Sequence, residues 1–255
     1  MKKPCQNSFE ILKMFIRMDF ILRYQNSVLG FLWVFLKPFL IFLVLLTVFT
    51  FFGGDIQHYQ VYLLLGIILF QFFSDGTTFG MHSILNKAHV ILKIPFSKTS
   101  VILAGTLNAL LHFFFALLIF FGFLFFNGLY PSFLNILLFL LLIFIEFLFI
   151  LGLSFFTSLW VISFRDLGQI WEVFLTALFY LVPIFYPLSI LPEHLQKILW
   201  FNPLSQIIVF SRDLLIYGKT VPSANILYLF IGSSLFCFLG WRYFQNKIQS
   251  FTEKI

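Results

Sequence analysis

The sequence predicts an all-α integral membrane protein, and three observations indicate this class. Hydrophobic residues make up 61% of the 255 residues, and charged residues only 10%. The apolar residues gather in runs of roughly 20, the length that an α-helix needs to cross a hydrocarbon core. Lysine and arginine concentrate in alternate connections between these runs, as they do on the cytoplasmic side of a membrane protein. The net charge of +6 therefore reflects membrane topology rather than binding to nucleic acid.

Residues 1–28 are predicted to contain a cytoplasmic amphipathic helix that lies in the membrane interface. A helical wheel places charged side chains in one narrow sector and apolar side chains in the sector beside it: Glu10, Lys13 and Arg17 against Phe9, Leu12, Ile16 and Phe20. A helix of this kind lies in the interface instead of crossing the bilayer. An interfacial anchor explains this periodicity without any further role.

Residues 29–255 are predicted to form one transmembrane domain with six membrane-spanning helices. Each of six runs is long and apolar enough to cross the hydrocarbon core. The runs lie near residues 30–52, 61–83, 101–126, 133–162, 170–187 and 224–243. The fourth run is long enough to tilt or to project into water.

The distribution of basic residues predicts that both termini are cytoplasmic. With six crossings, 13 of the 16 lysines and arginines fall on the side of the termini. The other three, Lys197, Arg212 and Lys219, lie in the segment between the last two spans. Because cytoplasmic flanks collect Lys and Arg, the side with 13 is assigned to the cytoplasm.

The segment 188–222 is predicted to form a pair of short helices on the outer side of the membrane. Pro192 can begin the first helix, Asn202-Pro203 separates the two, and Gly218 follows the second. Helical pieces of ~10 to 14 residues are too short to span and are typical of re-entrant or interfacial segments. A further crossing here would also place the basic C-terminal residues outside.

A motif at the junction between the amphipathic helix and the first span carries a family resemblance. It consists of an Arg-Tyr pair, a Ser-x-Leu-Gly-x-x-Trp pattern and a following proline: Arg23, Tyr24, Ser27, Gly30, Trp33 and Pro38. This junction resembles the start of the membrane subunit of ABC-2 type exporters. The resemblance is to the polysaccharide-export branch, which moves O-antigen, capsule or teichoic acid precursors.

Three later segments resemble the same family in the same order. The loop 84–98, after the second span, resembles the coupling helix that docks on the ATPase subunit, through Asn86, Lys87, Val90, Ile91, Lys93 and Pro95. Without the resemblance, a plain basic cytoplasmic loop explains it equally well. Arg165 and Asp166 form a short cytoplasmic turn, and the segment 188–222 resembles the family's external gate, with Asn202, Pro203 and Arg212.

The resemblance implies a homodimer of this subunit that pairs with two separate ABC ATPase subunits. This chain has no phosphate-binding loop, because Asp213 stands where Gly218-Lys219-Thr220 would require the first glycine. ATP and Mg²⁺ are therefore expected on the partner subunit, with no cofactor in this chain. The implied substrate is a lipid-linked polysaccharide, carried from the cytoplasm across the inner membrane.

Polar residues inside the predicted spans are candidates for intramembrane contacts, because burying such groups in lipid is costly. They are Lys37, Gln71, Asp75, Thr78 and Glu146. Gln71, Asp75 and Thr78 recur at helical spacing and share one face. Lys37 and Asp75 are expected at similar depth, so an ion pair and a channel lining are both open, and the two are compatible.

Aromatic residues near the outer ends of the spans are candidate stacking faces for sugar rings. They are Phe51, Phe52, Tyr59, Tyr180, Phe185 and Tyr186. The histidines lack neighbours with metal-ligand spacing, so no metal site is predicted. No catalytic constellation is found either.

The sequence also leaves two other functions open. One is an ABC-2 exporter of a drug or simple lipid, which the junction motif and the short outer loops argue against. The other is an integral membrane enzyme of glycan or lipid synthesis, which should show clustered acid, base or metal ligands at an interface.

Overall fold

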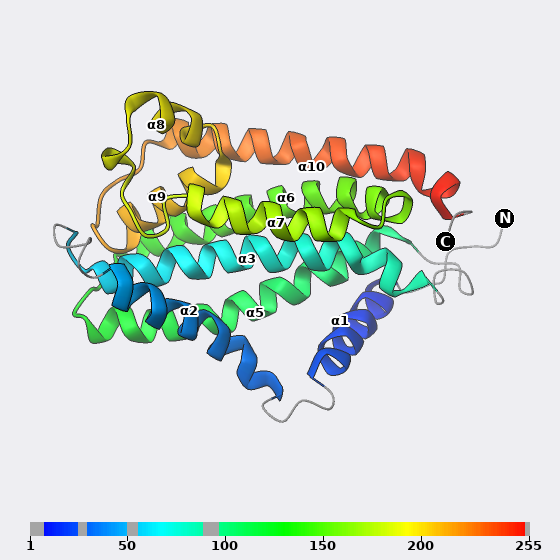
Figure 1. Ribbon diagram of the computed structural model, residues 1–255, viewed down its shortest axis with the longest axis horizontal. Coiled ribbons are helices and arrows are strands. Elements are labelled where there is room, and N and C mark those ends of the chain that lie inside the picture. The colour runs from blue at the N-terminus through cyan, green and yellow to red at the C-terminus, as the bar shows by residue number, and fades with distance from the viewer. Residues whose placement is uncertain (1–7, 25–29, 50–55, 89–96, 253–255) are drawn as a thin grey trace.

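The computed structural model describes residues 8–24, 30–49, 56–88 and 97–252, and the regular elements in these ranges are all helical (Figure 1). In chain order they are α1 Ser8–Tyr24, the 3₁₀ turn η1 Gly30–Leu32, α2 Trp33–Phe49, α3 Tyr59–Asn86, α5 Thr99–Phe126, α6 Phe133–Ser163, α7 Leu167–Leu181, the 3₁₀ turn η2 Leu188–Ile190, α8 Glu193–Trp200, α9 Pro203–Leu215 and α10 Ser223–Thr252.

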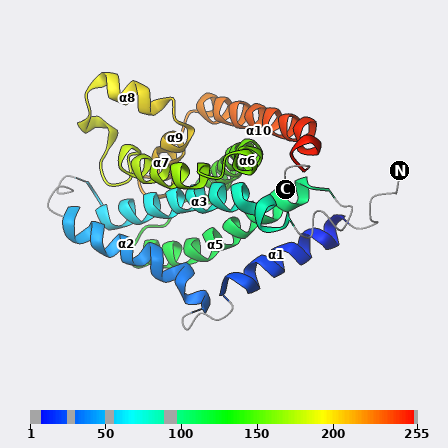
Figure 2. The same ribbon diagram turned by 45° about the vertical axis from the view of Figure 1, so that its right-hand side comes forward.

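The helices run lengthwise between two ends of the molecule, which we call the α1 end and the α8 end. The α1 end contains α1 and the C-terminal part of α10, which lie on opposite sides of the molecule (Figures 1 and 2). At the α8 end, α8 and α9 lie near the start of α10. Helices α3, α5, α6, α7 and α10 run between these ends, and α2 packs against α3 and α5 toward the α8 end.

Within the described residues, four helices are long and apolar enough to cross a membrane: α3, α5, α6 and α10. The chain is therefore a multi-pass membrane protein. Helices α2, with 17 residues, and α7, with 15, are apolar but shorter. At 1.5 Å per residue they measure about 25 and 22 Å, less than a hydrocarbon core of about 30 Å. They lie within the predicted first and fifth spans, and the six-span arrangement stays a prediction.

Two predicted boundaries differ from the structure. The fifth span is expected to continue to residue 187, but α7 ends at Leu181 and Val182 is extended. The reason is Pro183, which disfavours a helical conformation at the residue before it. The helix of the sixth span, in contrast, is longer than predicted, because α10 continues to Thr252 instead of ending near residue 243. Phe244 and Ile248, in this extension, are buried.

The two short helices α8 and α9 form at the positions that the sequence predicts. The Asn202 side chain caps α9 by accepting a hydrogen bond from the Leu204 amide at 3.0 Å, and Pro203 occupies the first helical turn. With 8 and 13 residues, neither helix can cross a membrane. The re-entrant placement of the pair remains a prediction.

Helix α3 is the centre of the fold, because 78% of its most apolar 18-residue stretch is buried. Its main partners are α5 and α6. Gly80 permits the close approach of α3 to α6, because a Cβ atom at this position would collide with the Ser154 side chain. The larger apolar core surrounds α3 between α5, α6 and α9. A second apolar cluster at the α1 end joins Phe15 of α1 to Ile84, Val101 and Phe244.

Candidate functional site

A groove with a volume of about 750 Å³ runs between α2, α3 and α7. Its polar wall includes Lys37, Gln71, Asp75, Thr78 and Glu172. Apolar and aromatic side chains of the three helices complete it, including Leu40, Val44, Phe70, Phe179 and Tyr180. We call this cavity the α2/α3/α7 groove.

The polar wall of this groove brings together residues that the sequence analysis names. Gln71 Nε2 donates a hydrogen bond to Asp75 Oδ1 at 2.6 Å. Lys37 Nζ lies 3.7 Å from the same oxygen, with 56% of the Lys37 side chain and 22% of the Asp75 side chain exposed. The ion pair thus lies in the wall of the groove, so pairing and cavity lining occur together.

Because the Lys37 side chain is more than half exposed, we predict that the pair contributes little to stability. Coupling between Lys37→Met and Asp75→Asn in a double-mutant cycle of thermal unfolding should be below about 1 kcal/mol. Both single variants should still fold. Coupling of several kcal/mol would instead show that the pair is buried in the assembled protein, as it would be in a dry membrane interior.

The polar stripe of α3 continues from the groove to a second cavity at the α1 end. This cavity has a volume of about 490 Å³ and lies between α1, α3 and α5. Thr78 and Phe79 line both cavities, and His82, Ser83 and Asn86 line the second one. Gln71, Asp75, Thr78, His82 and Asn86 therefore present one polar path along α3, from its α1 end to the middle of the molecule.

The second cavity contains an ion pair that fastens α1 to the rest of the fold. Lys87 is only 4% exposed and donates to Asp19 Oδ2 at 2.5 Å. Asn108 Nδ2 of α5 approaches the same oxygen at 3.5 Å, and the Lys87 ammonium lies 5.4 Å from the centre of the Phe15 ring. Helix α1 is thereby tied to the C-terminal end of α3, at the start of the predicted coupling loop.

Sequence reasoning missed Asp19. Its signal was present, since Asp19 shares a helix face with the buried Phe15, four residues earlier, while Glu10, Lys13 and Arg17 are exposed. A single acidic residue on the buried face of a basic helix indicates a partner on another element. In the coupling loop itself, Asn86 is exposed, whereas Val90, Ile91, Lys93 and Pro95 lie outside the described residues.

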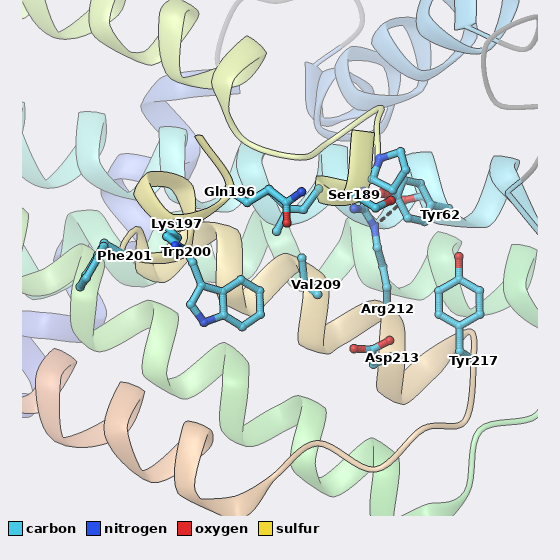
Figure 3. Close-up of a pocket in the computed structure, with 12 residues that line it drawn as sticks. Tyr62, Ser189, Gln196, Lys197, Trp200, Phe201, Val209, Arg212, Asp213 and Tyr217 are labelled. Atoms are coloured by element: carbon cyan, nitrogen blue, oxygen red, sulfur yellow. Dashed lines mark hydrogen bonds between the residues drawn. The ribbon is translucent and has the colours of Figure 1, made fainter. Parts of the chain in front are cut away.

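At the α8 end, Arg212 of α9 holds three segments together (Figure 3). The side chain is 2% exposed. It donates from Nε to the Tyr62 carbonyl at 3.2 Å, from Nη1 to the Pro183 carbonyl at 2.6 Å, and from Nη2 to the Ile184 carbonyl at 2.7 Å. The guanidinium carbon lies 3.4 Å from the centre of the Tyr62 ring. We call this arrangement the Arg212 clamp.

Two residues that the sequence analysis did not name complete the Arg212 clamp. Gly66 leaves the space that the guanidinium fills, because a Cβ atom there would lie 2.5 Å from Nη2. Tyr62 donates from its hydroxyl to the Tyr186 carbonyl at 2.9 Å. The chain that follows α7 is thus fixed to both α3 and α9, and its position depends on the charge of Arg212.

The aromatic candidates have different surroundings. Tyr180 is 59% exposed and lines the α2/α3/α7 groove. Tyr59 is buried and donates to the Phe185 carbonyl at 3.2 Å, while the Phe185 ring lies 4.6 Å from that of Phe49. Tyr186 donates to the Leu181 carbonyl at 2.5 Å. Phe51 and Phe52 lie outside the described residues.

The remaining predicted residues are separate from these sites. Glu146 is fully buried in α6, and neither carboxyl oxygen has a hydrogen-bond partner among the described residues; no feature of the fold explains it. Arg165 and Asp166 are exposed in the turn before α7.

Of the junction motif, Gly30, Trp33 and Pro38 are described in η1 and α2, with Pro38 buried. Arg23 and Tyr24 end the described part of α1, and Ser27 falls outside the described residues.

The polar groups of these sites form ion pairs and line cavities between helices. In the described ranges, no group of three His, Cys, Asp or Glu side chains could hold a metal ion. The charged groups instead pair across helices or line a groove that follows the long axis of the membrane-crossing helices. Such groups, inside a protein with membrane-crossing helices, are typical of the substrate pathways of membrane transport proteins.

Comparison with known proteins supports this class. Residues 11–216 match the ABC-2 type transporter family. The chain therefore belongs to the ABC-2 type transporter family, and it is the membrane permease part of a transporter rather than an enzyme.

Relatives of known name match nearly the whole chain. The O-antigen export system permease protein RfbA of Klebsiella pneumoniae is 28% identical over 243 residues, 92% of this chain and 94% of that protein. The protein of the same name from Myxococcus xanthus is 26% identical over 241 residues, covering 91% and 90%. The polysialic acid transport protein KpsM of Escherichia coli is 22% identical over 253 residues, covering 95% and 96%.

Proposed function

We propose that this chain is the membrane subunit of an ATP-driven exporter that moves a lipid-linked polysaccharide from the cytoplasm across the inner membrane. The observation that carries the proposal is the similarity over more than nine-tenths of the chain to permeases named for O-antigen export and polysialic acid transport. The cargo is of the O-antigen, capsule or teichoic acid type.

The α2/α3/α7 groove is proposed to form one half of the conduit through which the polymer passes. Its polar stripe on α3 offers hydrogen-bonding groups to a hydrated polymer, and Tyr180 offers an exposed ring. A single subunit leaves the groove open on one side, and α7 buries only Leu175. Two copies of the subunit would close the groove, with two ATPase subunits binding ATP and Mg²⁺ at the α1 end.

The coupling loop 84–98 is proposed to receive the motion of the ATPase. The ion pair between Lys87 and Asp19 joins the start of this loop to α1. Movement of the loop would therefore move the interfacial helix and α3 together. At the other end, Asn202, Pro203 and the Arg212 clamp are proposed to control the outer mouth of the conduit.

The proposed orientation places the α1 end in the cytoplasm. With Cys5 and Cys237 removed, single cysteines at Gln57 and Ser223 should react with an impermeant thiol reagent that is added to intact or outer-permeabilised cells. Cysteines at Ala88 and Ser250 should react only after the inner membrane is opened. Labelling of Ser250 from outside would contradict an inner-membrane protein with cytoplasmic termini.

The function is tested by removing the gene from its native strain. The strain should lose surface polysaccharide and accumulate lipid-linked polymer inside the cell, and a plasmid copy of the gene should restore both. A second assay should recover the ATPase subunit when the tagged permease is purified. Normal surface polysaccharide in the deletion strain would refute the proposal.

A further inference from the structure

A separate pocket with a volume of about 720 Å³ lies at the α8 end, outside the α2/α3/α7 groove. Residues of α8, α9 and η2, together with Tyr62 of α3, form its walls (Figure 3). Its size lies in the range of small-molecule binding sites, and its lining combines apolar surface with a few polar groups, as such sites do. The Arg212 clamp forms part of the pocket floor, so the pocket is adjacent to the proposed outer gate.

Besides the exposed ammonium of Lys197, the polar groups that the fold leaves open to this pocket include several hydrogen-bond acceptors. The Asp213 carboxylate is partly buried and accepts no hydrogen bond from the described residues, although Lys219 and Arg212 act on it electrostatically. Gln196 uses its amide nitrogen to donate to the Leu191 carbonyl at 2.7 Å, which leaves its amide oxygen as an acceptor. Ser189 adds an exposed hydroxyl.

Aromatic rings accompany these acceptors. Trp200 is 38% exposed, and its ring is held edge-on to Phe210 at 5.5 Å. The Tyr217 ring is partly exposed, with Lys219 Nζ 5.3 Å from its centre. In the view of Figure 3 Asp213 lies between Trp200 and Tyr217, and all three residues line the pocket. Exposed rings beside unused acceptors suit a ligand that has an apolar face and several hydroxyl donors.

We propose that this pocket binds a sugar residue of the polymer after it has crossed the membrane. The hydroxyls of the sugar would donate to Asp213 and Gln196, and its C–H face would lie on Tyr217 or Trp200. A purely apolar ligand such as an acyl chain would cover the Asp213 carboxylate without offering it a donor, which is costly. The inference depends on the proposed function, because it takes the exported polymer as the ligand.

Binding to the purified permease–ATPase complex tests the site. The complex is placed in lipid nanodiscs without sugar-based detergent, and the probe is the oligosaccharide mixture from partial acid hydrolysis of the strain's own surface polysaccharide. Affinity is measured by saturation-transfer NMR titration. Asp213→Asn should weaken binding at least about tenfold, because it removes a charged acceptor while keeping the shape of the side chain. Tyr217→Leu should weaken binding as well.

The matched control is Glu193→Gln, which removes an exposed carboxylate at the same end of the molecule but outside the pocket; it should bind like the wild type. Unchanged affinity for the oligosaccharide in both pocket variants would overturn the assignment. Binding of dodecanoate at this pocket without binding of the oligosaccharide would overturn it as well. If that result accompanies loss of surface polysaccharide in the deletion strain, the pocket assignment fails while the proposed function stands. Surface polysaccharide that persists in the deletion strain would remove both.

Discussion

Replacement of Arg212 by methionine should destabilise the protein severely, by at least about 3 kcal/mol. The variant leaves the Pro183 and Ile184 carbonyls buried without their donors and opens a space beside Gly66. Arg212→Lys should recover only part of this loss, because an ammonium cannot reproduce the planar guanidinium fork. The measurement is the thermal unfolding midpoint and the monodisperse yield in detergent.

Gly66 provides an independent test of the Arg212 clamp. Gly66→Ala should also lower the unfolding midpoint, since the new methyl group must displace Nη2 or the Ile184 backbone. The effects of Gly66→Ala and Arg212→Met should be less than additive, because both break the same contact. Gly122→Ala is the matched control, as a Cβ atom there meets nothing within 4 Å. Full additivity, or an Arg212→Met variant as stable as the wild type, would contradict the clamp.

Loss of the Lys87–Asp19 pair should have the second largest effect. Lys87→Met leaves the Asp19 carboxylate without its ammonium partner at a site only 22% exposed, at a cost of about 3 kcal/mol. Because α1 is then released from α3, less ATPase subunit should be recovered with the tagged permease. The double variant Lys87→Met with Asp19→Asn should regain stability, since no unpaired charge remains.

The same experiment separates stability from coupling. If α1 transmits motion through this pair, the double variant should fold well but still export less polysaccharide than the wild type. Arg165→Met, in the exposed turn before α7, is the control for loss of a positive charge at the α1 end. A Lys87→Met variant with normal stability and normal ATPase recovery would show that the pair fastens nothing.

The sequence predicted the membrane-crossing helices well because lipid imposes a strict length and polarity on them. Helices α3, α5, α6 and α10 form where apolar runs were found, and Pro192 and Asn202-Pro203 predicted α8 and α9. The early end of α7 was also readable from Pro183. The extension of α10 was not, because Phe244 and Ile248 are buried in the second apolar cluster, where Phe244 packs against Phe155 of α6, and no continuous apolar run marks them.

The contacts of the candidate sites were harder to predict. Lys37 and Asp75 could be paired in advance because both lie in spans at similar depth. Arg212 could not be connected to Pro183 and Ile184, since its acceptors are backbone carbonyls, which every residue carries. The role of Gly66 could not be predicted from the sequence, because this residue contributes only the absence of a side chain beside Arg212. Such contacts depend on the packing of distant segments.

Reconstituted transport is the decisive test of the proposed export function. The permease and its ATPase are placed in proteoliposomes with lipid-linked polysaccharide, and the polymer that reaches the protected lumen is measured by its resistance to an added glycosidase. We predict that resistant polymer appears only when both subunits and hydrolysable ATP are present. Transfer at the same rate without this chain, or no transfer with a complex that hydrolyses ATP, would contradict the assignment of this protein as the conduit.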